Sequence, residues 1–194
     1  MLEQKGYIVG VDEAGRGAWA GPVYAAAVIL NPESPLNGLK DSKLLNAKQR
    51  DVLYDKIVTE AVDYGVGFAS AEEIDKLNIL QATFLAMQRA VAALSQSIAA
   101  IWVDGHLAPM WSWPTRCIVN GDQLEPAISA ASILAKVSRD RLMQSWDADF
   151  PYDFGKHKGY GTPLHQQRLR QHGVSSVHRR SFKPVKLCLA LEDV

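Results

Sequence analysis

The residues best suited to chemistry lie between Tyr7 and Gly17, in the sequence YIVGVDEAGRG. The stretch from Tyr7 to Val11 has the aromatic and β-branched character of a buried strand, which places Asp12 and Glu13 where that strand leaves the core. Two adjacent carboxylates in a partly buried place repel each other and lose hydration, and a divalent cation is the usual compensation. Taken alone, the stretch fits an ordinary strand exit or a nucleotide-phosphate loop as well as a metal site.

A glycine-flanked arginine follows the two acids. Gly15 and Gly17 permit backbone conformations and close approaches that a Cβ atom forbids, which leaves peptide N–H groups free to face a ligand. Arg16 adds a planar fork of donors that suits phosphate. The segment Gly15-Arg16-Gly17 is therefore a candidate ligand-binding loop beside the acids.

Two more acids follow apolar segments that we predict to be strands. Asp104 follows residues 99–103, and Asp122 comes shortly after residues 115–119. Each also fits a common turn dipeptide with glycine. If these strands are parallel to the first, their ends lie along one edge of the sheet, and the four carboxylates converge there.

An all-oxygen set of ligands favours Mg²⁺ or Mn²⁺ over zinc. Two such ions about 3.5 to 4 Å apart stabilise both the attacking and the leaving oxygen in phosphodiester hydrolysis. The recurrence of acids after strands therefore indicates a metal-dependent nuclease.

The elements that must position these acids alternate between strand and helix. The apolar run 23–30 is predicted to pair antiparallel with the first strand, and residues 64–69 form another strand after a helix over 46–62. Ser70 and Glu73 have the spacing of a capping box, which begins a helical region reaching residue 94. Pro126 suits the first turn of a long helix, and Thr162 with Pro163 begins a later one. The pattern predicts an α/β fold.

Composition and charge agree with a globular protein. The 194 residues are 47% hydrophobic and 22% charged, which suits one domain. The N-terminus lacks a signal-peptide pattern, and no run approaches the roughly 18 apolar residues of a membrane span, so we expect a cytoplasmic protein without membrane contact. Cys117 and Cys188 lack the spacing of a zinc site or a disulfide framework.

The formal net charge of zero hides a basic span. Residues 155–186 contain eight Lys or Arg residues, no Asp or Glu, and four of the five histidines. The span is either a solvated face or a footprint for a phosphate backbone opposite the acids. Tyr160 lies between two glycines within it, and is either an exposed loop residue or a ring that stacks on a sugar or base. The histidines favour nucleic-acid contact or packing over metal binding.

Seven motifs in one order and spacing carry a resemblance that covers nearly the whole chain. The chain resembles ribonuclease HII, the bacterial type 2 ribonuclease H. The motifs are GVDEAGRG (10–17), LKDSK (39–43), VDG (103–105), NGD (120–122), PAISAASILAK (126–136), HKGYGT (157–162) and HRRSF (178–182).

The resemblance implies a ribonuclease H-like fold. In residues 1–150 it implies a catalytic domain with a five-stranded mixed sheet flanked by helices. Residues 151–194 would form a small, basic, helical C-terminal extension that closes over a duplex.

The resemblance also implies residue roles. Asp12, Glu13, Asp104 and Asp122 would be the catalytic carboxylates and would bind two Mn²⁺ or Mg²⁺ ions. The loop at Gly15, Arg16 and Gly17 would test the ribose 2′-hydroxyl, and Tyr160 would stack at the junction of RNA and DNA. The other expected substrate contacts are Ser42, Lys43, Lys136, Arg179 and Arg180. The chain departs from the family at Ala18-Trp19 and at Gln123, both of which concern substrate positioning.

The expected activity is cleavage of the RNA strand in RNA/DNA hybrids and cleavage 5′ of ribonucleotides embedded in duplex DNA. The products would carry 5′-phosphate and 3′-hydroxyl ends, and the enzyme would act as a monomer. One rival is a resolvase- or integrase-type nuclease that cuts DNA without a 2′-hydroxyl. The other is a non-catalytic duplex-binding protein, for which clustered carboxylates would be a liability because they repel phosphate.

Overall fold

The computed structural model describes residues 6–31, 33, 36, 38–39 and 45–192. Its centre is a five-stranded sheet in the order β3-β2-β1-β4-β5. The strands are β1 (Tyr7–Ala14), β2 (Val23–Ile29), β3 (Asp63–Ala69), β4 (Ile98–Asp104) and β5 (Thr115–Ile118). β1, β2 and β3 pair antiparallel, whereas β4 is parallel to β1 and β5 is parallel to β4. The predicted α/β fold with a mixed sheet is confirmed.

The helices begin where the sequence supplies caps. Asn46 and Ser70 each form a capping box, at α1 and α2 respectively, and Thr162 caps α7, which ends at Gly173. The helices are α1 (Ala47–Glu60), α2 (Ala71–Leu77), α3 (Ile79–Ala92), α4 (Gly121–Leu124), α5 (Pro126–Ser145), α6 (Phe154–His157), α7 (Pro163–His172) and α8 (Lys183–Glu192), with a 3₁₀ turn at Trp146–Ala148.

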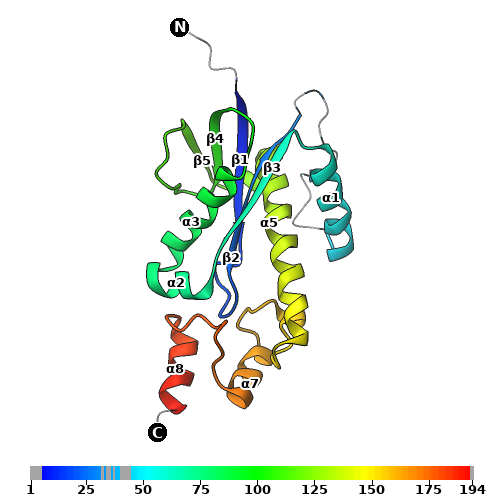
Figure 1. Ribbon diagram of the computed structural model, residues 1–194. Coiled ribbons are helices and arrows are strands. Elements are labelled where there is room, and N and C mark those ends of the chain that lie inside the picture. Colours follow the sequence, from blue (N-terminus) through cyan, green and yellow to red (C-terminus); the bar gives the residue numbers. More distant parts are fainter. Residues whose placement is uncertain (1–5, 32, 34–35, 37, 40–44, 193–194) are drawn as a thin grey trace.

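Helices cover both faces of the sheet (Figure 1). One face packs against α3 in a core that includes Val9, Val11 and Met87, and the other packs against α1 and α5 in a core that includes Ala26, Val28 and Leu134. Glycine lets α5 come close to the central strand, because a Cβ atom added at Gly10 would lie 2.2 Å from the carbonyl carbon of Ala127.

The C-terminal part has a small core of its own beyond one end of the sheet (Figure 1). That core includes Met143, Tyr152, Phe154 and Leu169. The chain after β1 lies beside it, since Ala20 bridges to His178. The division of the chain at residue 150 stays a prediction. Within the described residues, no helix combines the length and apolar character needed to cross a membrane.

Candidate active site

The sequence predicted that Asp12 and Glu13 lie where the first strand ends. In the structure both lie inside strand β1. The ladder between β1 and β2 continues to Ala14, with Asp12 opposite Ala26 and Glu13 opposite Ala25. The pairing of β1 with β4 ends one residue before Asp12, at Val11. The acids are therefore held by β2 along one edge of their strand and lie just past the end of the parallel ladder along the other edge.

The other two acids come from the neighbouring parallel strands. Asp104 is the last residue of β4, and Asp122 lies in α4, directly after the turn that follows β5. Asn120 adopts a left-handed conformation with φ of 56° in that turn. The backbone N–H of Asp122 donates to Oδ1 of Asp104 at 3.4 Å. Because β1, β4 and β5 are parallel, their ends bring the acids together at one edge of the sheet.

Burial and mutual repulsion perturb the acids of β1. Asp12 is 6% exposed, and its pKa is raised well above the usual range by burial and then by the charges of Glu13 and Asp104. Burial also raises the pKa of Glu13, while the charge of Arg16 opposes that rise. A nearby cation would relieve the desolvation and the repulsion at the same time.

The donor chemistry of these acids fits a hard divalent cation, since every donor is a carboxylate oxygen. Among the described residues, however, no three His, Cys, Asp or Glu side chains are already arranged to hold a metal ion. Local contacts occupy the two acids of β1: Oδ1 of Asp12 accepts from the Glu13 N–H at 2.7 Å, and Oε1 of Glu13 pairs with Arg16 at 3.2 Å. A cation would therefore replace Arg16 as the partner of Glu13.

The glycine loop is held from beneath by two buried arginines. Gly15 has a φ of 93°, and a Cβ atom there would lie 2.0 Å from Nε of Arg139. Arg139 itself donates to the carbonyl oxygens of Ala20 and Pro22. Arg16 and Gly17 are exposed. The loop is thus exposed to solvent at Arg16 and Gly17, and at Gly15 it packs against the buried guanidinium group of Arg139.

The sequence predicted that Arg179 contacts the substrate, but in the structure Arg179 does not reach the surface. Its side chain is fully buried, and it donates to the carbonyl oxygens of Gly15 at 2.7 Å, Arg16 at 2.7 Å and Gly21 at 2.9 Å. Burial and the charge of Arg139 lower the pKa of Arg179 to about 9, so the guanidinium stays protonated at neutral pH. Arg179 therefore contacts the loop and not the solvent.

The neighbouring Arg180 is exposed, as a phosphate contact requires. Its backbone N–H donates to the carboxylate of Asp75 in α2 at 2.8 Å, and Ser181 donates to the same carboxylate. Asp75 thus fixes the backbone while the Arg180 side chain remains at the surface.

Tyr160 and one of the four acids, Glu13, line the same cavity of about 340 Å³. The Tyr160 ring lies over the guanidinium of Arg139, 5.3 Å from the centroid. The cavity is also lined by Gly15 and Lys136. The structure therefore brings a carboxylate, the glycine loop, a lysine and an aromatic ring around one space, although they lie far apart in the sequence.

Sequence reasoning missed three residues around this cavity. Arg50 of α1 and Ser132 of α5 line it, and a hydrogen bond with Ser132 lowers the pKa of Asp12 against the larger effect of burial. Arg139 supports both Gly15 and Tyr160 from below. The local sequence carried no signal for Arg139, because its neighbours Asp140 and Arg141 are also charged and suit an exposed helix face.

The remaining expected contacts have mixed outcomes. Lys136 is partly exposed and pairs with Asp140. Ser42 and Lys43 lie outside the described residues. Trp19 is half-buried and packs against the chain at Gly161, where a Cβ atom would lie 2.1 Å from its ring, whereas Gln123 is exposed.

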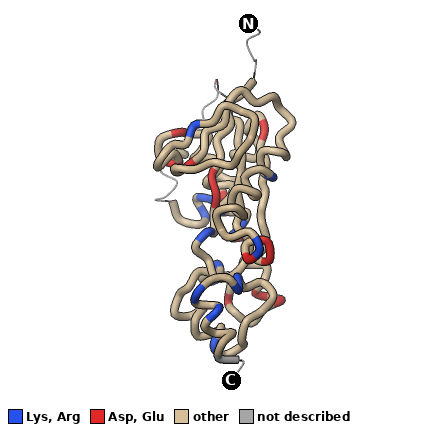
Figure 2. The backbone as a smooth tube through the Cα atoms, turned by 90° about the vertical axis from the view of Figure 1, so that its left-hand side faces the viewer, with Lys and Arg blue, Asp and Glu red and all other residues tan. Residues whose placement is uncertain are grey.

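The basic span is only partly available to a ligand. Blue segments recur from the middle of the molecule to its C-terminal end (Figure 2). Arg168 and Lys156 pair with Asp153 at 2.6 and 2.8 Å, and Arg179 is buried. The exposed cations of the span, apart from Lys156, are Arg170, Arg180, Lys183 and Lys186.

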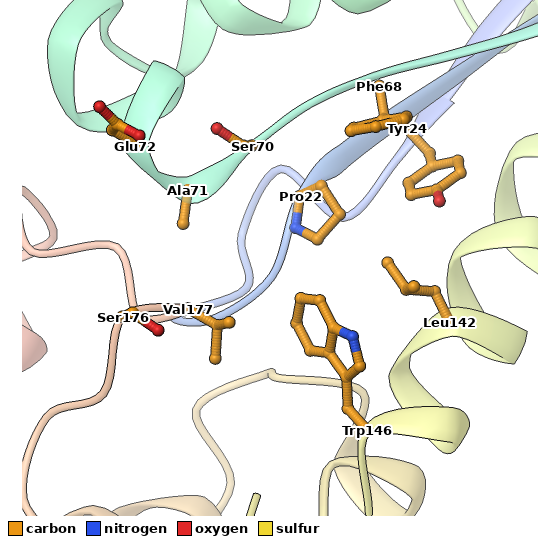
Figure 3. A pocket seen from close by; sticks show the side chains of 10 residues that line it. All are labelled: Pro22, Tyr24, Phe68, Ser70, Ala71, Glu72, Leu142, Trp146, Ser176 and Val177. Atoms are coloured by element: carbon orange, nitrogen blue, oxygen red, sulfur yellow. The ribbon is translucent and has the colours of Figure 1, made fainter. Parts of the chain in front are cut away.

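A larger hollow of about 500 Å³ opens away from the acids, between β2, β3, α5 and the segment before His178 (Figure 3). Its lining is mostly apolar and includes Pro22, Tyr24, Phe68 and Trp146. None of the four candidate catalytic acids lines this hollow, so the smaller cavity at Tyr160 is the better candidate site.

Comparison with known proteins agrees with this geometry. The family model described as Ribonuclease HII matches residues 9–185. The chain is 54% identical over 180 residues to a ribonuclease HII of Coxiella burnetii, covering 92% of this chain and 89% of that protein. It is 56% identical over 185 residues to a ribonuclease HII of Burkholderia cenocepacia, covering 95% and 86%. The crystal structure of ribonuclease H2 from Pyrococcus horikoshii OT3 superposes with a TM-score of 0.76 at 26% identity, covering 95% of this chain and 97% of that one.

Proposed function

The chain belongs to the ribonuclease HII family of metal-dependent endonucleases, which cut the RNA strand of RNA/DNA hybrids, and we propose that Asp12, Glu13, Asp104 and Asp122 are its catalytic and metal-binding residues. The observation that carries this proposal is the meeting of these acids at the ends of β1, β4 and β5. Their burial beside one another has no evident structural benefit, because it raises the pKa of Asp12.

Asp12, Glu13, Asp104 and Asp122 would hold two divalent ions, Mn²⁺ or Mg²⁺. When bound, the ions supply positive charge that activates the attacking water and stabilises the leaving 3′-oxygen. The protein contributes the fixed positions of the acids, which the strand ends and α4 provide, and forms no covalent intermediate. The products carry 5′-phosphate and 3′-hydroxyl ends.

The enzyme recognises a ribonucleotide by its 2′-hydroxyl, which is both a donor and an acceptor. The exposed loop at Arg16 and Gly17 offers peptide groups at close range, and its inner carbonyls are already occupied by Arg179. Tyr160 stacks on the adjoining deoxynucleotide across the shared cavity. This combination favours cleavage 5′ of a single ribonucleotide embedded in duplex DNA.

Residues 151–194 form an extension that closes over the duplex and grips its backbone. Arg180 is exposed, and Lys136 lines the cavity beside the acids. We assign phosphate contacts to these two residues, and to Ser42 and Lys43. The enzyme acts as a monomer in the cytoplasm.

The test compares three duplexes of one sequence: an RNA/DNA hybrid, a DNA duplex with one ribonucleotide, and an all-DNA duplex, each with Mg²⁺ or Mn²⁺. We expect cleavage of the first two and none of the third, and Asp122→Asn should abolish both activities. Equal cleavage of the all-DNA duplex would favour a DNA nuclease of the resolvase type. Binding without cleavage of any duplex would favour a non-catalytic protein.

A further inference from the structure

Three buried histidines lie close to Tyr160 without lining the cavity. His165, His178 and His157 are 0%, 1% and 7% exposed. The rings of His157 and His165 stack at 4.4 Å between centroids, and Phe154 contacts all three histidines. Buried imidazoles need hydrogen-bond partners, and the partners here identify what the histidines do.

A chain of hydrogen bonds runs from the segment before His178 to the backbone of Tyr160. The Ser175 N–H donates to Nδ1 of His178 at 3.1 Å. Nε2 of His178 lies 3.1 Å from Nε2 of His165. Nδ1 of His165 lies 3.0 Å from the carbonyl oxygen of Tyr160. The two rings therefore connect two segments of the C-terminal part through the interior.

The Ser175 hydroxyl oxygen also lies 2.8 Å from Nδ1 of His178, so the bond from the Ser175 N–H decides where the protons are. Nδ1 of His178 accepts from Ser175, so its proton is on Nε2 and is donated to His165. Nε2 of His165 must then be bare, which leaves its proton on Nδ1, facing the Tyr160 carbonyl. Both rings are neutral, and they are opposite tautomers.

The hydrogen bond from His165 is the side-chain contact among several that hold the peptide groups beside Tyr160, since the Tyr160 N–H donates to the carbonyl oxygen of His157 at 2.9 Å and the Thr162 N–H donates to the Tyr160 carbonyl at 2.8 Å. On the preceding side, the carbonyl oxygen of Gly159 accepts from the Trp19 N–H at 2.8 Å. On the following side, the carbonyl oxygen of Tyr160 itself accepts from His165. Trp19 also packs against the ring of His165, at 5.5 Å between centroids.

We propose that His165 and His178 are positioning residues for ribonucleotide recognition, in which a neutral two-histidine relay fixes the Tyr160 peptide and thereby the angle of its ring. The inference rests on the proposed role of Tyr160 in reading the junction. Neither histidine lines the cavity itself, so each acts through Tyr160, which does.

The electrostatics keep this relay neutral at working pH. Burial, then the charge of His157, lowers the pKa of His165 to about 4. Burial, then the charges of His165 and His157, lowers the pKa of His178 to about 3. His157 is thus the titratable group whose charge affects the pKa of both His165 and His178. The charges that affect the pKa of His157 itself are those of Asp153, Asp147 and Lys158. Protonating either ring of the pair would place two N–H groups against each other.

The first test needs only the wild-type protein. Nitrogen NMR of the imidazoles should show His165 protonated on Nδ1 and His178 on Nε2, both neutral at pH 7. It should also show His157 protonated on Nε2, because that atom lies 2.8 Å from the carbonyl oxygen of Tyr152. Finding His165 protonated on Nε2, or charged at pH 7, would overturn the relay.

The second test uses two substitutions that split the functions of His165. In His165→Asn the side-chain amide nitrogen lies near the position of Nδ1 and can still donate to Tyr160. In His165→Gln the amide oxygen can accept from His178, but the donor to Tyr160 is lost. His172→Gln, at an exposed histidine of the same helix, is the matched control.

The readout is the ratio of kcat/KM on a single-ribonucleotide duplex to kcat/KM on an all-RNA/DNA hybrid. We expect His165→Gln to lower this ratio roughly tenfold, the lower range of a base–aromatic stack, whereas His165→Asn and His172→Gln keep it. Equal loss in the Asn and Gln variants would indicate a merely structural role and overturn the relay.

Tyr160→Ala separates the two proposals. If Tyr160→Ala lowers the ratio and His165→Gln does not, the relay is wrong while the role of Tyr160 stands. If Tyr160→Ala leaves the ratio unchanged, the proposed role of Tyr160 is itself wrong, and the relay inference falls with it.

Discussion

Replacing Arg179 by glutamine removes the guanidinium that ties the C-terminal segment to the glycine loop. Arg179 donates to the carbonyls of Gly15, Arg16 and Gly21, and glutamine can reach one of them. Each carbonyl left without a donor costs about 1 to 3 kcal/mol, while the loss of charge relieves repulsion from Arg139. We expect the free energy of unfolding to fall by about 2 to 4 kcal/mol and Tm by roughly 5 to 15 °C.

The loss should appear in recognition and not in the salt dependence of binding. Arg179 is fully buried, so it neutralises no phosphate, and the slope of log affinity against log salt should be unchanged. The preference for a ribonucleotide duplex over all-DNA should fall because the glycine loop loses its support. Arg180→Gln is the matched control, since it removes an exposed arginine one residue away.

Arg180→Gln should shift the salt slope by about 0.9 and leave stability within about 0.5 kcal/mol of wild type. Binding to all three duplexes across a salt series, with denaturant unfolding of each variant, gives every quantity. If Arg179→Gln instead showed a flatter salt slope with normal stability and normal preference, Arg179 would contact phosphate in the complex. The buried position of Arg179 would then not be its position in the active enzyme.

Three further predictions follow from the site. Asp104→Asn and Asp122→Asn should each abolish cleavage while denaturation shows a folded protein, and near-normal turnover with Mg²⁺ would exclude the four-carboxylate site. Tyr160→Ala should lose at least about tenfold in kcat/KM on a single-ribonucleotide duplex and Tyr160→Phe less, because stacking is worth roughly 1 to 3 kcal/mol. The free energy of unfolding should fall as pH drops from 6.5 to about 4, because unfolded His165 takes up a proton before the folded ring does. His165→Asn should reduce that fall; an unchanged pH dependence would mean that the buried ring already titrates normally.

Much of the fold could be predicted because several strands and helices had a signal in their local sequence. The apolar run of β2, the capping boxes at Asn46 and Ser70, and Pro126 at the start of α5 all depend on neighbouring residues. The acids were also predictable as a group, because parallel strands bring their ends to one edge. Their exact position was not: β1 runs through Asp12 and Glu13 because β2 continues to pair with it beyond the end of β4.

The buried arginines show what local patterns cannot provide. Arg179 looks like a phosphate contact in a basic span, yet its partners are carbonyls some 160 residues earlier in the chain, at sequence separations of 158, 163 and 164. Arg139 is buried for the same reason, under Gly15 and Tyr160. Such partners arise only when distant segments meet, and the sequence around each arginine carries no sign of them.

Small residues form much of the buried face of α3. Ala86 and Ala90 are fully buried, because a Cβ atom at Gly65 would lie 2.1 Å from the carbonyl oxygen of Ala90 and one at Gly67 would lie 2.4 Å from that of Ala86. Phe84 packs against the core between α3 and the sheet and also lines a cavity with Glu13 and Asp104. Close approach between α3 and a glycine-containing strand thus buries the small residues of this helix together with Met87 and Val91.

The most direct test of the account is to map the cut in a DNA duplex that contains one ribonucleotide, with Mg²⁺ or Mn²⁺ and with a chelator. The account predicts a single cut on the 5′ side of the ribonucleotide, leaving 3′-hydroxyl and 5′-phosphate ends, and no cut when the ions are chelated. A cut that persists in the chelator, falls elsewhere in the duplex, or leaves a 2′,3′-cyclic phosphate would contradict it.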